Sequence, residues 1–203
     1  MSRWLWAALV AVLLVLAAAL GVRYLVPPAR QEAATQQGPV PIGGPFTLTD
    51  QTGKRVTAED FRGRFMLVYF GYTFCPDICP LGLQTIAQAY DELPPELQER
   101  VVPVFITVDP ARDTVEVVRD YVHLFHPRLV GLTGSEAEIA DTLRAWRVYA
   151  RKAEATSGDG AYLVDHSTFT YLMDREGHYL AHFGHGTTPE EMAERLAELV
   201  GPG

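Results

Sequence analysis

Residues 65–80 read FMLVYFGYTFCPDICP. Phe65 to Gly71 is a short apolar run, rich in aromatic side chains and flanked by glycine at both ends, which is typical of a strand buried on both faces. From Pro80 to Leu93 the apolar residues recur at a helical spacing, and proline is well tolerated in a first helical turn. The stretch therefore predicts a central strand, a tight loop that carries two cysteines, and a helix.

The chain downstream of this stretch alternates in the same way. Two further strands and two further helices are predicted, with the strands at 101–108 and 129–132 and the helices at 113–125 and 135–146. Asp113 with Glu116, and Ser135 with Glu138, have the spacing of a capping box at the helix starts. Alternating strands and helices indicate parallel strands joined by right-handed crossovers.

Hairpins are predicted near both ends of the folded region. Turn residues at 50–53 separate short strands at 46–49 and 55–57, and turn residues at 174–177 separate strands at 169–173 and 179–183. An amphipathic helix at 188–200 closes the chain. A mixed central sheet flanked by helices gives the predicted fold class, α/β and thioredoxin-like.

The N-terminal segment predicts a membrane anchor. Residues 4–22 carry no charged side chain, and at 1.5 Å per residue this run approaches the roughly 30 Å thickness of a bilayer core. Small residues at 17–19 also fit a cleaved secretory signal. Trp4, Trp6 and Tyr24 stand at the two ends of the run, where interfacial anchors lie, and favour an uncleaved transmembrane helix.

Three parts of the chain follow from this interpretation. Residues 1–26 are predicted to be a transmembrane anchor or uncleaved signal, and residues 27–45 a flexible linker rich in Pro, Gly, Gln and Ala. Residues 46–203 are predicted to form one folded domain. Either interpretation of the N-terminus exports that domain, so we expect a single-pass protein of the cytoplasmic membrane with its domain in the periplasm or another extracytoplasmic space.

The charge balance excludes one class of partner. The protein has 17 basic and 25 acidic residues, and its first 30 residues hold three arginines and no acid. The remainder therefore carries 14 basic against 25 acidic residues, a net charge of −11. Such a domain repels phosphate backbones, so nucleic-acid binding is not expected.

Cys75 and Cys79 are the only cysteines. They lie between a predicted strand and a helix N-terminus, where the helix dipole and free backbone N–H groups favour a thiolate. In an exported protein two cysteines often form a structural disulfide. A bridge across so short a loop constrains the unfolded chain little. The spacing therefore favours a metal-binding or redox-active pair.

A third ligand is sought among six histidines, at positions 123, 126, 166, 178, 182 and 185. Thiolates suit Cu(I), Zn(II) or iron–sulfur clusters. Iron–sulfur clusters are usually bound by four cysteines and closed zinc sites by four ligands, whereas Cu(I) accepts two thiolates and one imidazole. His166 is favoured, because its loop is expected beside the cysteine loop. His123 and His126 suit a helix C-terminus, and the cluster around His182 is a weaker candidate for a second site.

Three motifs carry a family resemblance: residues 71–80 (GYTFCPDICP), 108–114 (VDPARDT) and 164–167 (VDHS). Together they resemble the Sco/SenC family, thioredoxin-like copper proteins associated with cytochrome c oxidase assembly, over about residues 42–199. The resemblance implies that Cys75, Cys79 and His166 bind one copper ion, Cu(I) or Cu(II). It also implies a recipient, the dinuclear copper site of oxidase subunit II, with an upstream copper donor and a thiol reductant.

Three carboxylates are predicted to support these ligands. Asp77 lies between the cysteines, and Asp165 precedes His166, whose imidazole it could orient. Asp109 follows a strand at the sheet edge where such folds place functional loops, although Asp-Pro is also an ordinary turn opener.

Competing functions remain open at this point. The protein is predicted to be a metallochaperone rather than an enzyme. The main alternative is a thiol–disulfide oxidoreductase, which uses Cys75 and Cys79 to keep the recipient's cysteines reduced. A cysteine peroxidase and an anchored binding domain with a structural disulfide are the other two.

Overall fold

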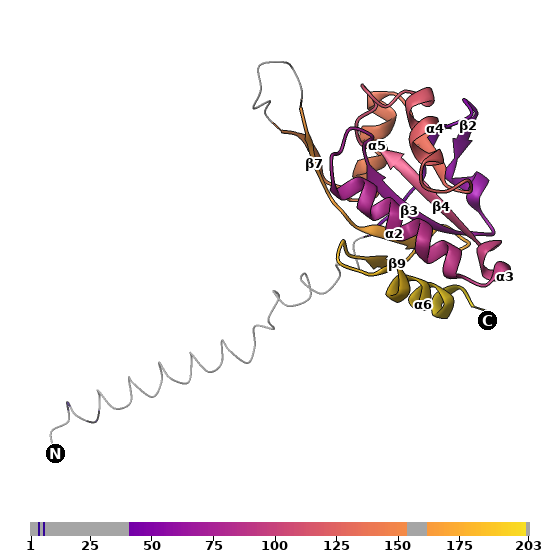
Figure 1. Ribbon diagram of the computed structural model, residues 1–203. Coiled ribbons are helices and arrows are strands. Elements are labelled where there is room, and N and C mark those ends of the chain that lie inside the picture. The colour runs from indigo at the N-terminus through magenta and orange to yellow at the C-terminus, as the bar shows by residue number, and fades with distance from the viewer. Residues whose placement is uncertain (1–3, 5, 7–40, 154–161, 202–203) are drawn as a thin grey trace. The chain divides into compact units, whose positions relative to one another are not determined.

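The computed structural model describes residues 4, 6, 41–153 and 162–201 (Figure 1). The chain divides into two units, 1–40 and 41–203, and the fold below is that of the second. None of the helices in the described residues is both long and apolar enough to cross a membrane. Apart from Trp4 and Trp6, the predicted anchor lies outside the described residues, as does the linker up to residue 40. Both therefore stay predictions.

A seven-stranded sheet runs through this unit in the order β2-β1-β5-β4-β3-β8-β9. The strands are β1 (Thr47–Asp50), β2 (Arg55–Thr57), β3 (Phe65–Gly71), β4 (Val101–Thr107), β5 (Val130–Thr133), β8 (Thr170–Met173) and β9 (Tyr179–Phe183). β3, β4 and β5 are parallel, whereas β1 and β8 join them antiparallel. Every residue of β3 and β4 is buried. The predicted mixed sheet with a central strand at 65–71 is confirmed.

Helices cover both faces of the sheet. They are α2 (Ile78–Glu92), α3 (Pro95–Gln98), α4 (Val115–His123), α5 (Glu136–Ala145) and α6 (Pro189–Val200), with a 3-10 turn, η1, at Ala58–Phe61. The Phe105 ring of β4 lies 5.5 Å from that of Tyr121 in α4, and Tyr69 of β3 meets Gly82 of α2 on the same face. α6 packs beside α2 (Figure 1).

The opposite face of the sheet is covered at the end of α5. The Phe70 ring of β3 lies 5.4 Å from that of Trp146, the residue that caps this helix. Adjacent residues of one strand therefore contact helices on opposite faces, as the alternation of side chains along a strand requires. The layered arrangement is the predicted thioredoxin-like one.

Two helix starts differ from the prediction. α2 begins at Ile78 rather than Pro80, so Cys79 lies inside its first turn. The capping box predicted for Asp113 and Glu116 is wrong, because Thr114 is the N-cap of α4 and its hydroxyl accepts from Val117 N at 3.4 Å. Both Asp and Thr are favourable N-cap residues. Here the carboxylate of Asp113 accepts a hydrogen bond from Thr73 instead, so Thr114 is left to cap the helix. The box at the start of α5 is confirmed.

A two-stranded ribbon outside the main sheet was not predicted. β6 (Ala150–Lys152) pairs antiparallel with β7 (Val164–His166), so that Ala150 lies opposite His166. Figure 1 shows the ribbon, in orange, rising from one edge of the domain. The strands are short and partly exposed, and hence give little hydrophobic alternation. The ribbon matters because its last residue is the predicted imidazole ligand.

The corrected cap gives a first prediction. Replacing Thr114 by Ala removes the hydroxyl that accepts from Val117 N, and should lower the free energy of unfolding by about 1 kcal/mol in urea denaturation. Thr114→Ser keeps the hydroxyl and should stay within about 0.5 kcal/mol of the wild type. Equal stability of the Ala and Ser variants would contradict this assignment of the cap.

Candidate metal centre

The cysteine loop joins the end of β3 to the start of α2. A turn closed by Cys75 N donating to Tyr72 O at 3.2 Å brings the chain back toward the helix. Cys75 stays in the loop and is partly exposed, whereas Cys79 in the first helical turn is fully buried. The backbone N–H of Cys79 donates to Cys75 Sγ at 3.4 Å. A free N–H at a helix N-terminus thus points at the first sulfur, as expected from the sequence.

His166 reaches the cysteines from the ribbon. Its Nδ1 lies 2.8 Å from the carbonyl oxygen of Ser167, to which it donates, and this contact turns Nε2 toward Cys79 Sγ at 3.2 Å. Tyr72 packs edge-on against the imidazole, with ring centroids 5.8 Å apart. The ring is therefore fixed in both tautomer and direction, which is the usual arrangement of a metal-binding histidine.

The three predicted donors come together in one place. One ligand atom from each of Cys75, Cys79 and His166 lies within 4.8 Å of the other two, and no other group of three or more such donors meets in the described part of the chain. Two sulfurs and one imidazole nitrogen form a soft donor set that fits Cu(I), with one fewer ligand than closed zinc sites use.

The two thiols differ strongly in acidity. A hydrogen bond with Cys79, together with His166 and the backbone N–H groups of Asp77 and Cys79, holds the pKa of Cys75 well below its usual range. The same hydrogen bond, reinforced by burial, raises the pKa of Cys79. One thiolate is thus preformed, and the second proton leaves when a metal binds.

A buried carboxylate fastens the cysteine loop to the rest of the domain. Asp113 is fully buried and accepts from Thr73 twice, from N at 3.1 Å and from Oγ1 at 2.6 Å, and once from Thr107 Oγ1. Burial raises the pKa of Asp113, and these hydrogen bonds oppose that shift. The spacing of Asp113 and Glu116 predicted a local capping role for this residue, whereas the structure shows a contact across 40 positions of the chain.

A second buried carboxylate ties the loop after β4 to the ribbon. Asp109 is 1% exposed and accepts from Tyr162 Oη at 2.8 Å and from Arg112 Nε. Arg112 also donates to the carbonyl of Tyr162 at 3.0 Å. The structure thus gives Asp109 a role in placing the strand that carries His166, beyond that of a turn opener.

Arg112 also contacts the cysteine loop through aromatic rings. Its guanidinium carbon lies 3.7 Å from the ring centroid of Tyr162, 4.8 Å from that of Phe74 and 5.7 Å from that of Tyr72. In addition, Val164 N donates to Tyr72 Oη at 3.2 Å. Sequence reasoning missed this role of Arg112. Its place in the motif 108–114 was the available signal.

The other two predicted carboxylates do not orient the imidazole. Asp165 is exposed and has no hydrogen bond to His166 within the described structure, because the carbonyl of Ser167 already holds Nδ1. The orienting role predicted for Asp165 is therefore corrected. Asp77 is exposed and caps α2 without a side-chain hydrogen bond, so its contribution to the centre is its backbone N–H.

The remaining histidines lie elsewhere. His126 accepts from Arg128 N at 3.0 Å after the end of α4, in agreement with a structural role there, and His123 closes that helix. His182 contacts the hydroxyl of Tyr179 and the ring of Phe169. His178, His182 and His185 do not form a three-donor group in the described residues.

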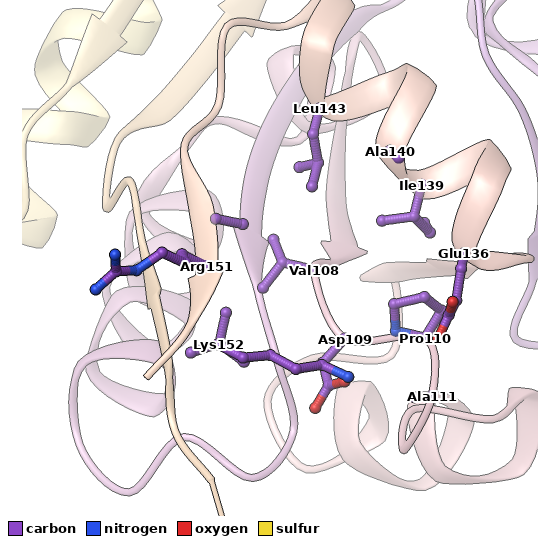
Figure 2. Close-up of a pocket in the computed structure, with 12 residues that line it drawn as sticks. Val108, Asp109, Pro110, Ala111, Glu136, Ile139, Ala140, Leu143, Arg151 and Lys152 are labelled. Atoms are coloured by element: carbon purple, nitrogen blue, oxygen red, sulfur yellow. The ribbon is translucent and has the colours of Figure 1, made fainter. Parts of the chain in front are cut away.

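A groove of about 240 Å³ separates the ribbon from α5 (Figure 2). Figure 2 shows Arg151 and Lys152 pointing to opposite sides of the ribbon, with Asp109 below Lys152 and the apolar side chains of Ile139 and Leu143 across the gap. No cysteine or histidine lines it. The groove is therefore separate from the metal centre.

Comparison with known proteins agrees with this geometry. The family model SCO1/SenC matches residues 34–201. The chain belongs to the SCO1/SenC family. A mitochondrial SCO1 homolog 1 from Arabidopsis thaliana is 43% identical over 175 residues, covering 84% of this chain and 52% of that protein. The chain thus spans about half the length of this SCO1 relative.

Solved SCO1/SenC structures have the same fold. Arabidopsis thaliana ScoI with copper bound is 44% identical, with a TM-score of 0.71, and the match covers 78% of this chain and 98% of that one. Bradyrhizobium japonicum ScoI with copper bound is also 44% identical at a TM-score of 0.71, covering 78% and 99%. BsSco, described as a member of the Sco family of cytochrome c oxidase assembly proteins, is 22% identical (TM-score 0.62; 82% and 98% covered) and shows the fold alone.

The buried carboxylate gives a second prediction. Asp113→Asn places an amide N–H₂ where one oxygen accepts from Thr73 or Thr107, so at least one buried donor loses its acceptor. We expect the free energy of unfolding to fall by about 1–3 kcal/mol, with faster hydrogen exchange at the Thr73 amide.

The matched control is Asp120→Asn, on the exposed surface of α4, where Arg119 is the one ion-pair partner of Asp120 among the described residues. This variant should change stability by less than about 0.5 kcal/mol. An Asp113→Asn protein as stable as the wild type, with a protected Thr73 amide, would show that the carboxylate does not hold the loop.

Proposed function

We propose that this SCO1/SenC protein is a copper metallochaperone that assists assembly of the dinuclear copper site in cytochrome c oxidase subunit II. The observation that carries the proposal is the convergence of Cys75, Cys79 and His166 within 4.8 Å. Two thiolates and one imidazole suit Cu(I) among the ions available to an exported protein. Copper-bound relatives at 44% identity support the choice of ion.

The surroundings of the donors suit delivery as well as binding. A hollow of about 350 Å³ opens beside Cys75 and His166, with the exposed side chains of Ile78 and Leu163 on its rim. An incoming thiolate can reach Cys75 from this side, whereas buried Cys79 is shielded. Copper as cargo can therefore pass by stepwise exchange of ligands, which begins at the exposed sulfur.

The export of the domain is part of the same proposal. A recipient site in an extracytoplasmic domain of the oxidase requires a donor on that side of the membrane. The uncharged run at 4–22 supports a single-pass anchor in the cytoplasmic membrane, with residues 46–203 facing the periplasm or extracytoplasmic space. An upstream copper donor and a thiol reductant would complete the cycle.

Thiol–disulfide exchange is the less favoured alternative. It would use the acidic Cys75 as nucleophile and Cys79 as the resolving thiol. It gives no task to His166, whose Nε2 lies 3.2 Å from Cys79 Sγ and whose Nδ1 is held by a backbone carbonyl. An imidazole held in one orientation is typical of a metal ligand and is not needed for thiol–disulfide exchange.

A titration with Cu(I) tests the site. Reduced wild-type protein, titrated without oxygen against a competing chelator, should bind one Cu(I) tightly. His166→Ala should lose more than the roughly 10- to 100-fold that removal of a group supporting a ligand costs. His182→Ala is the matched control and should bind like the wild type. Tight binding by a folded His166→Ala variant would remove His166 from the ligand set.

A cellular experiment tests the role. Cys75→Ser and Cys79→Ser should each lower the level of assembled, active oxidase when copper is scarce, and added copper should restore part of it. Spectra of the oxidase haems and copper in isolated membranes measure the effect. Wild-type oxidase levels in either variant under copper limitation would rule out the proposed role, even if the copper site itself exists.

A further inference from the structure

Tyr69 is a buried side chain next to the metal donors for which no role has yet been given. It lies on β3, just before the cysteine loop, and is 1% exposed. Its hydroxyl has no hydrogen-bond partner within the described structure. A buried hydroxyl without a partner costs free energy that phenylalanine would avoid. An acceptor that becomes available in another state of the protein would account for the hydroxyl.

Two glycines place the Tyr69 ring against the Cys79 sulfur. A β-carbon at Gly71 would lie 3.0 Å from Cys79 Sγ and 3.1 Å from Tyr69 Cε1, so the sulfur and the ring edge are neighbours. On α2, a β-carbon at Gly82 would lie 3.2 Å from Tyr69 Oη. Neither contact leaves room for a side chain. Cε1 is the ring carbon next to the one that bears the hydroxyl, so the hydroxyl lies beside the ring edge that neighbours the buried sulfur.

The Cys79 sulfur needs a donor once it is a thiolate. Because Cys79 is fully buried, water does not solvate its charge. A thiol that coordinates a metal loses its proton, so Cys79 becomes a thiolate when copper binds. A metal-bound thiolate keeps free lone pairs, and a neighbouring O–H can donate to one of them.

We propose that Tyr69 is a positioning residue of the copper centre: its hydroxyl donates a hydrogen bond to the Cys79 thiolate and sets the relative affinity for Cu(I) and Cu(II). The inference rests on the copper function proposed above. A hydrogen bond to a metal-bound sulfur draws electron density from it. The sulfur then donates less to Cu(II), so the bond favours the electron-rich Cu(I) state.

The test compares Tyr69→Phe with Tyr121→Phe. The Tyr121 hydroxyl is also buried without a partner among the described residues, but its ring lies between Phe105 and Phe125. Affinities for Cu(I) and Cu(II) are measured separately by chelator competition. Tyr69→Phe should lower the ratio of Cu(I) to Cu(II) affinity about three- to tenfold, as one hydrogen bond allows. The sulfur-to-Cu(II) absorption band should move to lower energy.

The control should leave both the affinity ratio and the band within error of the wild type. An unchanged ratio and band in folded Tyr69→Phe would overturn the proposal, and so would an equal shift in Tyr121→Phe. Thermal unfolding of the metal-free proteins checks the structural alternative. Both variants should melt at or above the wild-type temperature, because neither loses a hydrogen bond. A lower midpoint for Tyr69→Phe alone, with unchanged affinities, would make the hydroxyl structural.

A metal-free measurement separates this inference from the copper function. The reduced pair is equilibrated with oxidised glutathione at neutral pH, where one glutathione disulfide oxidises Cys75 and Cys79 to a disulfide and two glutathione thiols form. Without a metal Cys79 keeps its proton, so the Tyr69 hydroxyl has no thiolate to donate to, and Tyr69→Phe should leave this equilibrium within error of the wild type. A clear shift would place the effect of the hydroxyl in the metal-free pair and would overturn the proposal, whether or not the protein binds copper.

Discussion

Two buried carboxylates on the loop after β4 hold the functional edge of the domain together. A buried carboxylate costs several kcal/mol unless its oxygens are fully paired. The oxygens of Asp113 are paired chiefly with Thr73 of the cysteine loop, and those of Asp109 with Arg112 and with Tyr162, just before β7 of the ribbon. The cost of these charges is offset only when both neighbouring segments are in place. The loop after β4 therefore holds both the cysteine loop and the ribbon in place.

This arrangement explains how donors from separate sheets can form one centre. The cysteines follow a strand of the main sheet, whereas His166 ends a strand of the two-stranded ribbon, and backbone pairing does not join the two sheets in the described residues. Side chains make the connection instead, through Arg112 and through Tyr72, which accepts from Val164 N and packs on the imidazole. Such contacts can open locally without unfolding the sheet, which would suit the copper delivery proposed above.

The sequence predicted what depends on local pattern and missed what depends on long-range contacts. The all-apolar strand at 65–71 and the capping box at Ser135 were predictable. A strand buried on both faces appears as a continuous apolar run, and a capping box as two polar residues three positions apart. The ribbon was not, because its strands are short and half-exposed. Asp113 was wrongly predicted to be a cap because Thr73, which donates to its carboxylate, is 40 residues away in the sequence. The donors were predictable from motifs, and their supporting contacts were not.

The spacing of the cysteines makes the two sulfurs differ in exposure and acidity, and this difference determines which sulfur an incoming ligand can reach. With three residues between them, Cys79 falls inside the first turn of α2 and is buried, while Cys75 stays in the loop and receives the N–H of Cys79. The exposed sulfur is the stronger acid and faces the hollow beside Ile78 and Leu163, whereas the buried one lies against Tyr69 and His166. In the copper transfer proposed above, a partner's thiolate would therefore meet the exposed sulfur first, and the buried sulfur would leave last.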